Sequence, residues 1–148
     1  MLIGVGTDIL HLPRLLNLFA RRSQEHFAQR ILTTSELAVF HALPASDASR
    51  RVRFLAVRYS GNARRYLMCY TNCNLSWSLK EAAYKAVFPT RRLVWKDVEI
   101  TRCAAGKPSL EVNDTLGLSS KLHCSVSHDG DYVVAFVVAE DTSRNSTS

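Results

Sequence analysis

Glu81 and Lys85 are a pair of residues whose types and spacing could do chemistry. They lie in a segment of strong helix formers that is followed by Pro89, which predicts a helix over residues 77–88. Residues four apart lie on one face of a helix, so Trp77, Glu81 and Lys85 should share a face. The pair could also be an ordinary solvated ion pair worth about 0.3–0.5 kcal/mol.

Asp8 and His128 are two further candidates. Asp8 ends an apolar, strand-like run over residues 1–9, where an unpaired carboxylate is costly to bury, so it should hold a cation or cap a helix. Together with Glu81 it could form a site for Mg²⁺, which binds one or two carboxylates with waters and substrate phosphates. Lys85 could meet a phosphate or accept a proton, and His128 could hydrogen-bond to a phosphate oxygen or simply be a turn residue.

The first half of the chain is predicted to be one strand followed by helices. The strand over residues 1–9 contains Gly4 and Gly6, and no third glycine completes a dinucleotide-binding motif. Small residues here should allow close backbone packing or the approach of a ligand. Helices are expected over residues 11–22, 24–32 and 34–43, the last capped by Thr33, Thr34 or Ser35, and a helical pattern resumes at Arg50.

The second half is predicted to be mostly strands. Residues 98–103 and 108–112 alternate around a turn at 105–107, and residues 122–126 form a strand leading to a polar turn over 127–131. Residues 115–121 could be a short helix or a loop. The continuous apolar run over 132–139 suits a central strand, and residues 141–148 form a polar, frayed tail. Strands together with helices indicate an α+β fold in one domain over residues 1–140.

Composition and charge limit the classes of protein. The chain has 148 residues, 47% hydrophobic and 22% charged, and it contains no apolar run near the roughly 20 residues of a membrane span. Its four cysteines lack zinc-type spacing, which favours free thiols in a reducing, intracellular compartment. Residues 1–96 carry 15 Lys and Arg against 5 Asp and Glu, whereas residues 97–148 carry 4 against 8. This asymmetry favours an anionic partner, although it could be only a solvated basic face.

Several short motifs follow one another along the chain. They are Gly4-Val5-Gly6-Thr7-Asp8-Ile9, Lys80-Glu81-Ala82 with Lys85, Gly106-Lys107-Pro108, and Ser127-His128-Asp129, supported by Arg14, by Arg30…Thr33…Glu36 and by Phe54-Leu55-Ala56-Val57-Arg58. This ordered set spans residues 2–140 and resembles the holo-acyl-carrier-protein synthases, the short, single-domain type of phosphopantetheinyl transferase.

The resemblance implies a small antiparallel sheet packed on a long helix and shorter helices, and it implies a reaction. In that reaction coenzyme A binds with Mg²⁺, the hydroxyl of a serine in an acyl carrier protein attacks the β-phosphate, and 3′,5′-ADP leaves. Such enzymes serve fatty acid biosynthesis. They are usually homotrimers with sites between subunits, so Asp8 and Glu81 could meet within one chain or across two.

The resemblance also assigns roles to residues. Asp8 and Glu81 would ligate Mg²⁺, and Lys85 would lie by the pyrophosphate as charge stabiliser or proton acceptor. The residues expected to contact coenzyme A are Lys85, Lys107, Pro108, Ser127 and His128. The residues expected to face the acidic helix of the carrier protein are Arg14, Arg21 and Arg22.

Residues 59–76 depart from the family pattern. Without these 18 residues, Arg58 would precede Trp77 directly, as in the family, within one helix running from residue 50 to residue 88. The segment is either a surface loop or a translated retained intron. It could shift Glu81 relative to Asp8, so a weakened or inactive isoform of the enzyme is one alternative function.

A basic module that binds phosphate or nucleic acid without catalysis is the other alternative. The aromatic residues of the chain are not interleaved with the basic ones as a stacking platform requires, which argues against a nucleic-acid partner.

The location depends on the source of the protein. A eukaryotic source would imply a mitochondrial location and a bacterial source a cytoplasmic one. The strand-like run from Leu2 leaves no room for a presequence.

Overall fold

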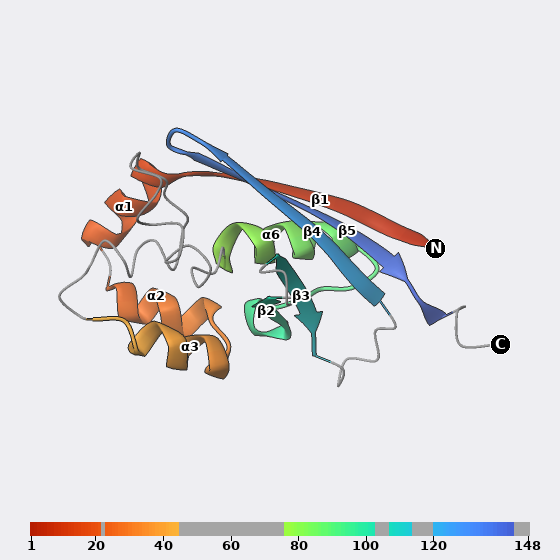
Figure 1. Ribbon diagram of the computed structural model, residues 1–148, viewed down its shortest axis with the longest axis horizontal. Helices are drawn as coiled ribbons and strands as arrows, with labels where there is room; N and C mark the ends of the chain where they lie inside the picture. Colours follow the sequence, from red (N-terminus) through yellow and green to blue (C-terminus); the bar gives the residue numbers. More distant parts are fainter. Residues whose placement is uncertain (22, 45–75, 103–106, 114–119, 144–148) are drawn as a thin grey trace.

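A five-stranded antiparallel sheet organises the fold. The computed structural model describes residues 1–21, 23–44, 76–102, 107–113 and 120–143. The strands are β1 (Leu2–His11), β2 (Val98–Arg102), β3 (Pro108–Val112), β4 (Ser120–Asp129) and β5 (Tyr132–Asp141), and they lie in the order β1-β5-β4-β3-β2. The long strands β1, β5 and β4 run side by side along the molecule (Figure 1). The α+β fold with a small antiparallel sheet is therefore confirmed.

Helix α6 (Ser76–Val87) packs against one face of the sheet (Figure 1). The core between them contains small helix residues and alternate strand residues, all buried: Leu79, Ala82, Ala83, Ala86, Val87, Val98, Ile100, Leu122, Ala135, Val137 and Ala139. Alanines on the helix let its backbone lie close to the strands. The predicted helix over 77–88 thus agrees with the structure to within one residue at each end.

Three short helices lie at one end of the sheet: α1 (Leu12–Arg21), α2 (Gln24–Ile31) and α3 (Thr34–His41). Thr33 is the N-cap of α3, and it forms a capping box with Glu36, in which each side chain accepts a hydrogen bond from the other residue's backbone N–H. A second cluster of buried residues joins these helices to the sheet, and it includes Leu12, Leu15, Ile31, Phe40 and Val133. A short 3₁₀ helix, η2 (Trp95–Asp97), precedes β2.

Two predicted strand ends were wrong. Strand β1 continues to His11, so Asp8 lies inside a strand rather than after it. Strand β4 continues to Asp129, and its last cross-strand pair with β5 is Asp129 with Tyr132. Residues 127–129 are therefore strand, and the turn consists only of Gly130-Asp131. Gly130 has a φ of 52°, the left-handed conformation that a tight hairpin turn requires.

Strand β5 lies between β1 and β4, as predicted for the run over 132–139, but only one of its faces is buried. Tyr132, Val134 and Phe136 point away from α6 and are 50%, 40% and 41% exposed. The strand also includes Asp141, whose backbone exchanges hydrogen bonds of 2.7 and 2.9 Å with Met1, so residue 141 is not part of a frayed tail as predicted.

Other predictions concern residues outside those described. These are the helical pattern from Arg50, the segment 59–76 apart from Ser76 at the start of α6, and most of the short helix or loop expected over 115–121, whose last two residues belong to β4 instead. Among the described helices, none is long and apolar enough to cross a membrane.

Candidate active site

Gly4 and Gly6 let β1 lie directly against α6. A Cβ atom at Gly4 would lie 2.4 Å from the carbonyl oxygen of Ala86, and one at Gly6 would lie 2.0 Å from that of Ala82. Neither contact leaves room for a side chain, so close backbone packing, one of the two predicted uses of these glycines, is confirmed. Asp8 is the next residue on the same face of β1, and its carboxylate therefore lies beside the same helix.

Lys85 joins Asp8 to Glu81. Its ammonium donates hydrogen bonds to Asp8 Oδ1 at 3.1 Å and to the backbone oxygen of Thr7 at 3.0 Å. The same Nζ lies 4.0 Å from Glu81 Oε1. Asp8 and Glu81 thus meet within one chain, and the predicted shared face of Trp77, Glu81 and Lys85 carries two of the three members of this cluster.

One oxygen of the Asp8 carboxylate forms no hydrogen bond within the described part of the chain. This oxygen is Oδ2, and it is buried. A buried carboxylate oxygen without a partner is unfavourable, and a bound cation would satisfy it. No group of three His, Cys, Asp or Glu side chains in the described part of the chain could hold a metal ion. The pair Asp8 and Glu81 nevertheless fits Mg²⁺, which uses one or two carboxylates and completes its shell with water and phosphate oxygens.

An open groove of about 820 Å³ lies next to these carboxylates. Asp8 and Glu81 line it together with Trp77 and residues of α1, among them Arg14 and Arg21. Arg22 lies outside the described residues. The groove therefore combines two carboxylates with two arginines, an arrangement that can hold a cation and an anionic ligand together.

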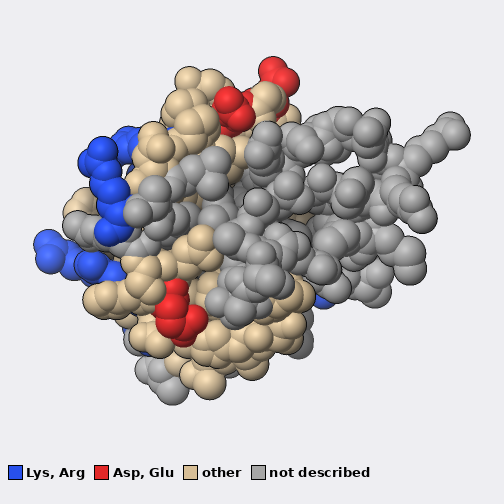
Figure 2. All heavy atoms as spheres, turned by 90° about the vertical axis from the view of Figure 1, so that its left-hand side faces the viewer, with Lys and Arg blue, Asp and Glu red and all other residues tan. Residues whose placement is uncertain are grey.

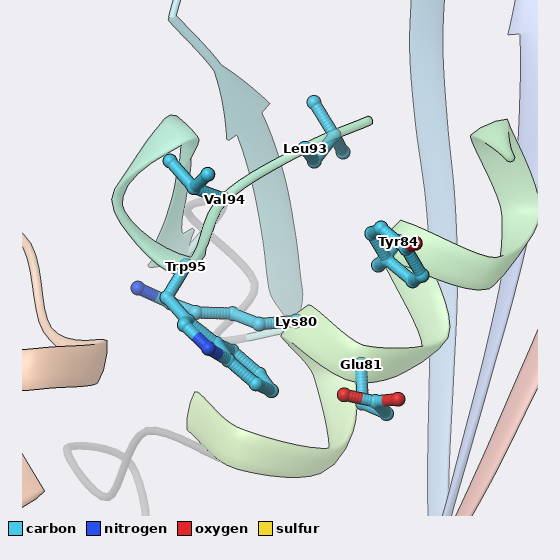
Figure 3. A pocket seen from close by; sticks show the side chains of 6 residues that line it. All are labelled: Lys80, Glu81, Tyr84, Leu93, Val94 and Trp95. Carbon is cyan, nitrogen blue, oxygen red and sulfur yellow. The ribbon is translucent and has the colours of Figure 1, made fainter. Parts of the chain in front are cut away.

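A smaller cavity of about 230 Å³ lies beside the groove and also touches Glu81. Figure 3 shows Tyr84, Leu93, Val94 and Trp95 around it, with Lys80 and Glu81 from consecutive positions of α6. Trp77 stacks on Trp95 with ring centroids 4.7 Å apart and on Phe27 at 5.0 Å. These aromatic contacts tie the first turn of α6 to η2 and α2.

Lys80 is buried, and its role was missed in the sequence. Its Nζ forms an ion pair with Glu36 Oε2 at 2.6 Å and donates a hydrogen bond to the backbone oxygen of Ile31 at 2.9 Å. Glu36 Oε1 accepts a hydrogen bond from the backbone N–H of Ile100 at 3.0 Å. Burial lowers the pKa of Lys80 from its ordinary value, and Glu36 opposes this shift. The sequence did offer a sign of this burial, because Lys80 lies among the apolar residues of the helix. It follows Leu79 directly and lies three residues before Ala83.

The predicted coenzyme-binding residues other than Lys85 lie elsewhere in the chain. His128 is exposed on β4, on the same sheet face as Asp8, but β5 lies between the two strands, and the β5 partners of Asp8 and His128 are Ala135 and Val133. Ser127 lies on the opposite face of β4. Lys107 is exposed before β3, and Pro108 begins that strand, its carbonyl oxygen accepting a hydrogen bond from Cys124 Sγ at 3.2 Å. Within one chain, these four residues do not line the groove beside Asp8 and Glu81.

Basic residues gather on the face that carries the short helices. Figure 2 shows this face, where most of the visible Lys and Arg side chains lie along its left-hand edge. Arg14 and Arg21, which line the groove, give it positive charge that favours an anionic ligand.

Comparisons with known proteins identify the family of this chain. The profile of the 4′-phosphopantetheinyl transferase superfamily matches residues 4–137. The chain is 33% identical over 138 residues to a holo-[acyl-carrier-protein] synthase of Wolbachia sp. subsp. Drosophila simulans, an alignment that covers 93% of this chain and 98% of the relative.

Two crystal structures have the same fold. The holo-[acyl-carrier-protein] synthase of Neisseria meningitidis matches with a TM-score of 0.66 and 30% identity, over 95% of this chain and 99% of that one. The holo-(acyl-carrier-protein) synthase of Bacillus anthracis, solved in complex with CoA (3′,5′-ADP), matches with a TM-score of 0.64 and 28% identity, over 96% and 99%. The chain therefore belongs to the holo-acyl-carrier-protein synthase family of the 4′-phosphopantetheinyl transferase superfamily, and it is a transferase.

Proposed function

We propose that this protein transfers 4′-phosphopantetheine from coenzyme A to a serine of an apo-acyl carrier protein, with Mg²⁺, and thereby serves fatty acid biosynthesis. The observation that carries the proposal is the cluster in which Lys85 joins Asp8 to Glu81 beside an open groove with two arginines. Membership of the family and the coenzyme-bound relative support the same reaction.

The reaction requires charge neutralisation and positioning more than covalent help from the protein. The serine hydroxyl oxygen forms a bond to the β-phosphorus of coenzyme A, the bond from that phosphorus to the 3′,5′-ADP oxygen breaks, and the hydroxyl proton leaves to a base. Asp8 and Glu81 would hold Mg²⁺, which would neutralise charge on the pyrophosphate. Lys85, next to both, would stabilise phosphate charge or accept the proton.

The remaining predicted coenzyme contacts require a second chain. Lys107, Pro108, Ser127 and His128 lie apart from the groove of their own chain, so we propose that they complete the site of a neighbouring subunit in a homotrimer. The outer face of β1 and β5 supports association, because it exposes a row of apolar side chains. These are Val5, Ile9, Tyr132, Val134 and Phe136, each at least 40% exposed.

The carrier protein would dock on the basic side of the groove. Arg14 and Arg21 are exposed and line it, and Arg22 follows them directly in the sequence. We infer that all three face the acidic helix of the carrier, which favours encounter through charge complementarity. A nucleic-acid partner is not supported.

We further propose that residues 1–140 form the transferase domain, with residues 59–76 as an insertion before α6. An insertion here would weaken transfer if it shifts Glu81 relative to Asp8. Comparing the full chain with a variant lacking residues 59–76 tests this idea, and equal transfer rates would contradict it.

We propose an intracellular location, in the reducing compartment of the carrier protein. The mitochondrial alternative has no support from the comparisons.

The direct test combines the protein with coenzyme A, Mg²⁺ and an apo-acyl carrier protein, followed by mass spectrometry of the carrier. We expect the carrier to gain one phosphopantetheine group. Replacing Asp8→Ala or Glu81→Ala should abolish this gain. An unmodified carrier with the unaltered protein would refute the proposed function.

A further inference from the structure

The Lys85 ammonium lies next to the carboxylates of both Asp8 and Glu81. It is 3.1 Å from Asp8 Oδ1 and 4.0 Å from Glu81 Oε1, and it belongs to the same helix as Glu81, one turn later. We infer that Lys85 is the resident counter-ion of this carboxylate pair and must leave the position between them when Mg²⁺ binds. This inference rests on the proposed function, which assigns the metal to Asp8 and Glu81.

The contacts of Lys85 explain why it occupies this place. Its ammonium donates hydrogen bonds to Asp8 Oδ1 and to the backbone oxygen of Thr7, while its positive charge also faces Glu81. The side chain of Asp8 is only 13% exposed and that of Glu81 is 29% exposed, so water screens their mutual repulsion poorly. An internal cation removes that repulsion in the metal-free protein.

Mg²⁺ and the Lys85 ammonium would compete for the carboxylates of Asp8 and Glu81. Magnesium lies about 2.1 Å from each oxygen ligand and demands near-octahedral geometry. A divalent ion held by Asp8 and Glu81 would compete with the Lys85 ammonium for their carboxylate oxygens, and the two cations would repel each other. Lys85 is able to move, because its side chain is 43% exposed and the open groove lies next to the Asp8–Glu81 pair.

Displacement would place the ammonium in the groove, where a phosphate group could accept its hydrogen bonds. The same lysine would then neutralise carboxylates before the metal binds and phosphate oxygens afterwards. With Lys85 displaced, Mg²⁺ would bind more tightly together with an anionic ligand than alone, because the anion stabilises the lysine in its new position.

A different arrangement makes the opposite prediction. Asp8 Oδ2 has no partner among the described residues, so a metal could bind this oxygen while Lys85 stays on Oδ1 and holds the carboxylate in place. In that arrangement Lys85 supports the metal ligand, and its loss would weaken metal binding. The sign of the change therefore separates displacement from support.

The test measures Mg²⁺ binding by calorimetry and Mn²⁺ binding by electron paramagnetic resonance, without coenzyme A or carrier. We expect Lys85→Gln and Lys85→Met to lower the Kd for both ions about two- to five-fold, the factor expected for a partly exposed ion pair. Arg14→Gln is the matched control, because it removes the same charge from the groove wall outside the Lys85 cluster.

Thermal unfolding gives a second readout that does not depend on activity. Without metal, both Lys85 variants should unfold at a lower temperature than the wild type, and saturating Mg²⁺ should raise their Tm more than it raises the wild-type Tm. A Kd that is unchanged or higher in the Lys85 variants would overturn the inference. An equal fall in Kd in Arg14→Gln would also overturn it, since it would reflect the general charge of the groove. The carrier-modification assay is separate, so its failure would refute the proposed function and leave the binding result interpretable.

Discussion

A Cβ atom at Gly6 would lie 2.0 Å from the backbone carbonyl oxygen of Ala82 and 2.6 Å from the backbone nitrogen of Ala86. These neighbours are backbone atoms of α6, so they cannot turn aside as a flexible side chain would. We expect Gly6→Ala to push β1 away from α6 and to lower the free energy of unfolding by about 1–3 kcal/mol. Denaturant unfolding of the purified variant measures this change.

The same substitution should also reduce transfer, because Asp8 follows two residues later and would move away from Lys85 and Glu81. Thr7→Ala is the matched control, since Thr7 is exposed and neighbours Gly6. Its free energy of unfolding should stay within about 0.5 kcal/mol of the wild type. A Gly6→Ala protein as stable and as active as Thr7→Ala would show that the close approach of β1 and α6 has no role.

Lys80→Met should be strongly destabilising. The substitution leaves the buried carboxylate of Glu36 without its cation and the backbone oxygen of Ile31 without its donor. Breaking a buried ion pair from one side costs about 3–5 kcal/mol of unfolding free energy, which chemical denaturation can measure.

The double variant Lys80→Met with Glu36→Gln provides the control. Its glutamine carries no charge, and its side-chain oxygen can still accept the hydrogen bond from the Ile100 N–H. We therefore expect the double variant to be more stable than Lys80→Met alone. A double variant that is less stable than either single one would argue against coupling between these two side chains.

The elements around the site were largely predictable from local patterns. The helix formers before Pro89 gave α6 to within one residue, and Gly4 and Gly6 indicated the close packing of β1. Asp8, Glu81 and Lys85 were recognised as one cluster because of their residue types and the order of the motifs. The spacing Glu81-Lys85 alone did not separate a metal site from a surface ion pair.

Three features needed the tertiary structure. Residues 127–129 are polar and were predicted as a turn, but pairing with β5 extends β4 through them, and Gly130 with its positive φ makes the turn. The partner of Lys80 is Glu36, 44 residues away, and no local pattern links the two. The separation of His128 from Asp8 also depends on strand order, because β5 lies between their strands.

Stability should depend on pH through Cys124. Burial raises the pKa of its thiol, and the nearby Lys107 opposes this shift. A raised pKa in the folded state means that the thiol stabilises the fold fully below the unfolded-state pKa, roughly 8.5, and that this contribution is lost as the pH rises further. The stability difference between the wild type and Cys124→Ala should therefore shrink from about pH 8 to about pH 10. A constant difference in denaturant unfolding across this range would contradict the assignment.

Carrier binding should depend on Arg14 and Arg21. Both are exposed at the groove, so Arg14→Ala and Arg21→Ala should each raise the KM for the carrier about two- to five-fold and weaken the salt dependence, with little change in kcat. Arg92→Ala removes an exposed charge that does not line the groove and serves as the control. Equal KM values for all three variants would argue against docking at this groove.

The central claim is that Asp8 and Glu81 of the same chain form one catalytic site. Coexpressing Asp8→Asn with Glu81→Gln tests it, because each chain then lacks one carboxylate of the same site and no mixed oligomer can restore an intact pair. Coexpressing Asp8→Asn with His128→Ala is the control, since the proposed site between subunits would recover activity in that mixture.

The measurement is the mass of the carrier after incubation with coenzyme A and Mg²⁺. We predict that the carrier stays unmodified with the Asp8→Asn and Glu81→Gln mixture, as with either variant alone. A carrier that gains phosphopantetheine with this mixture would contradict the single-chain site.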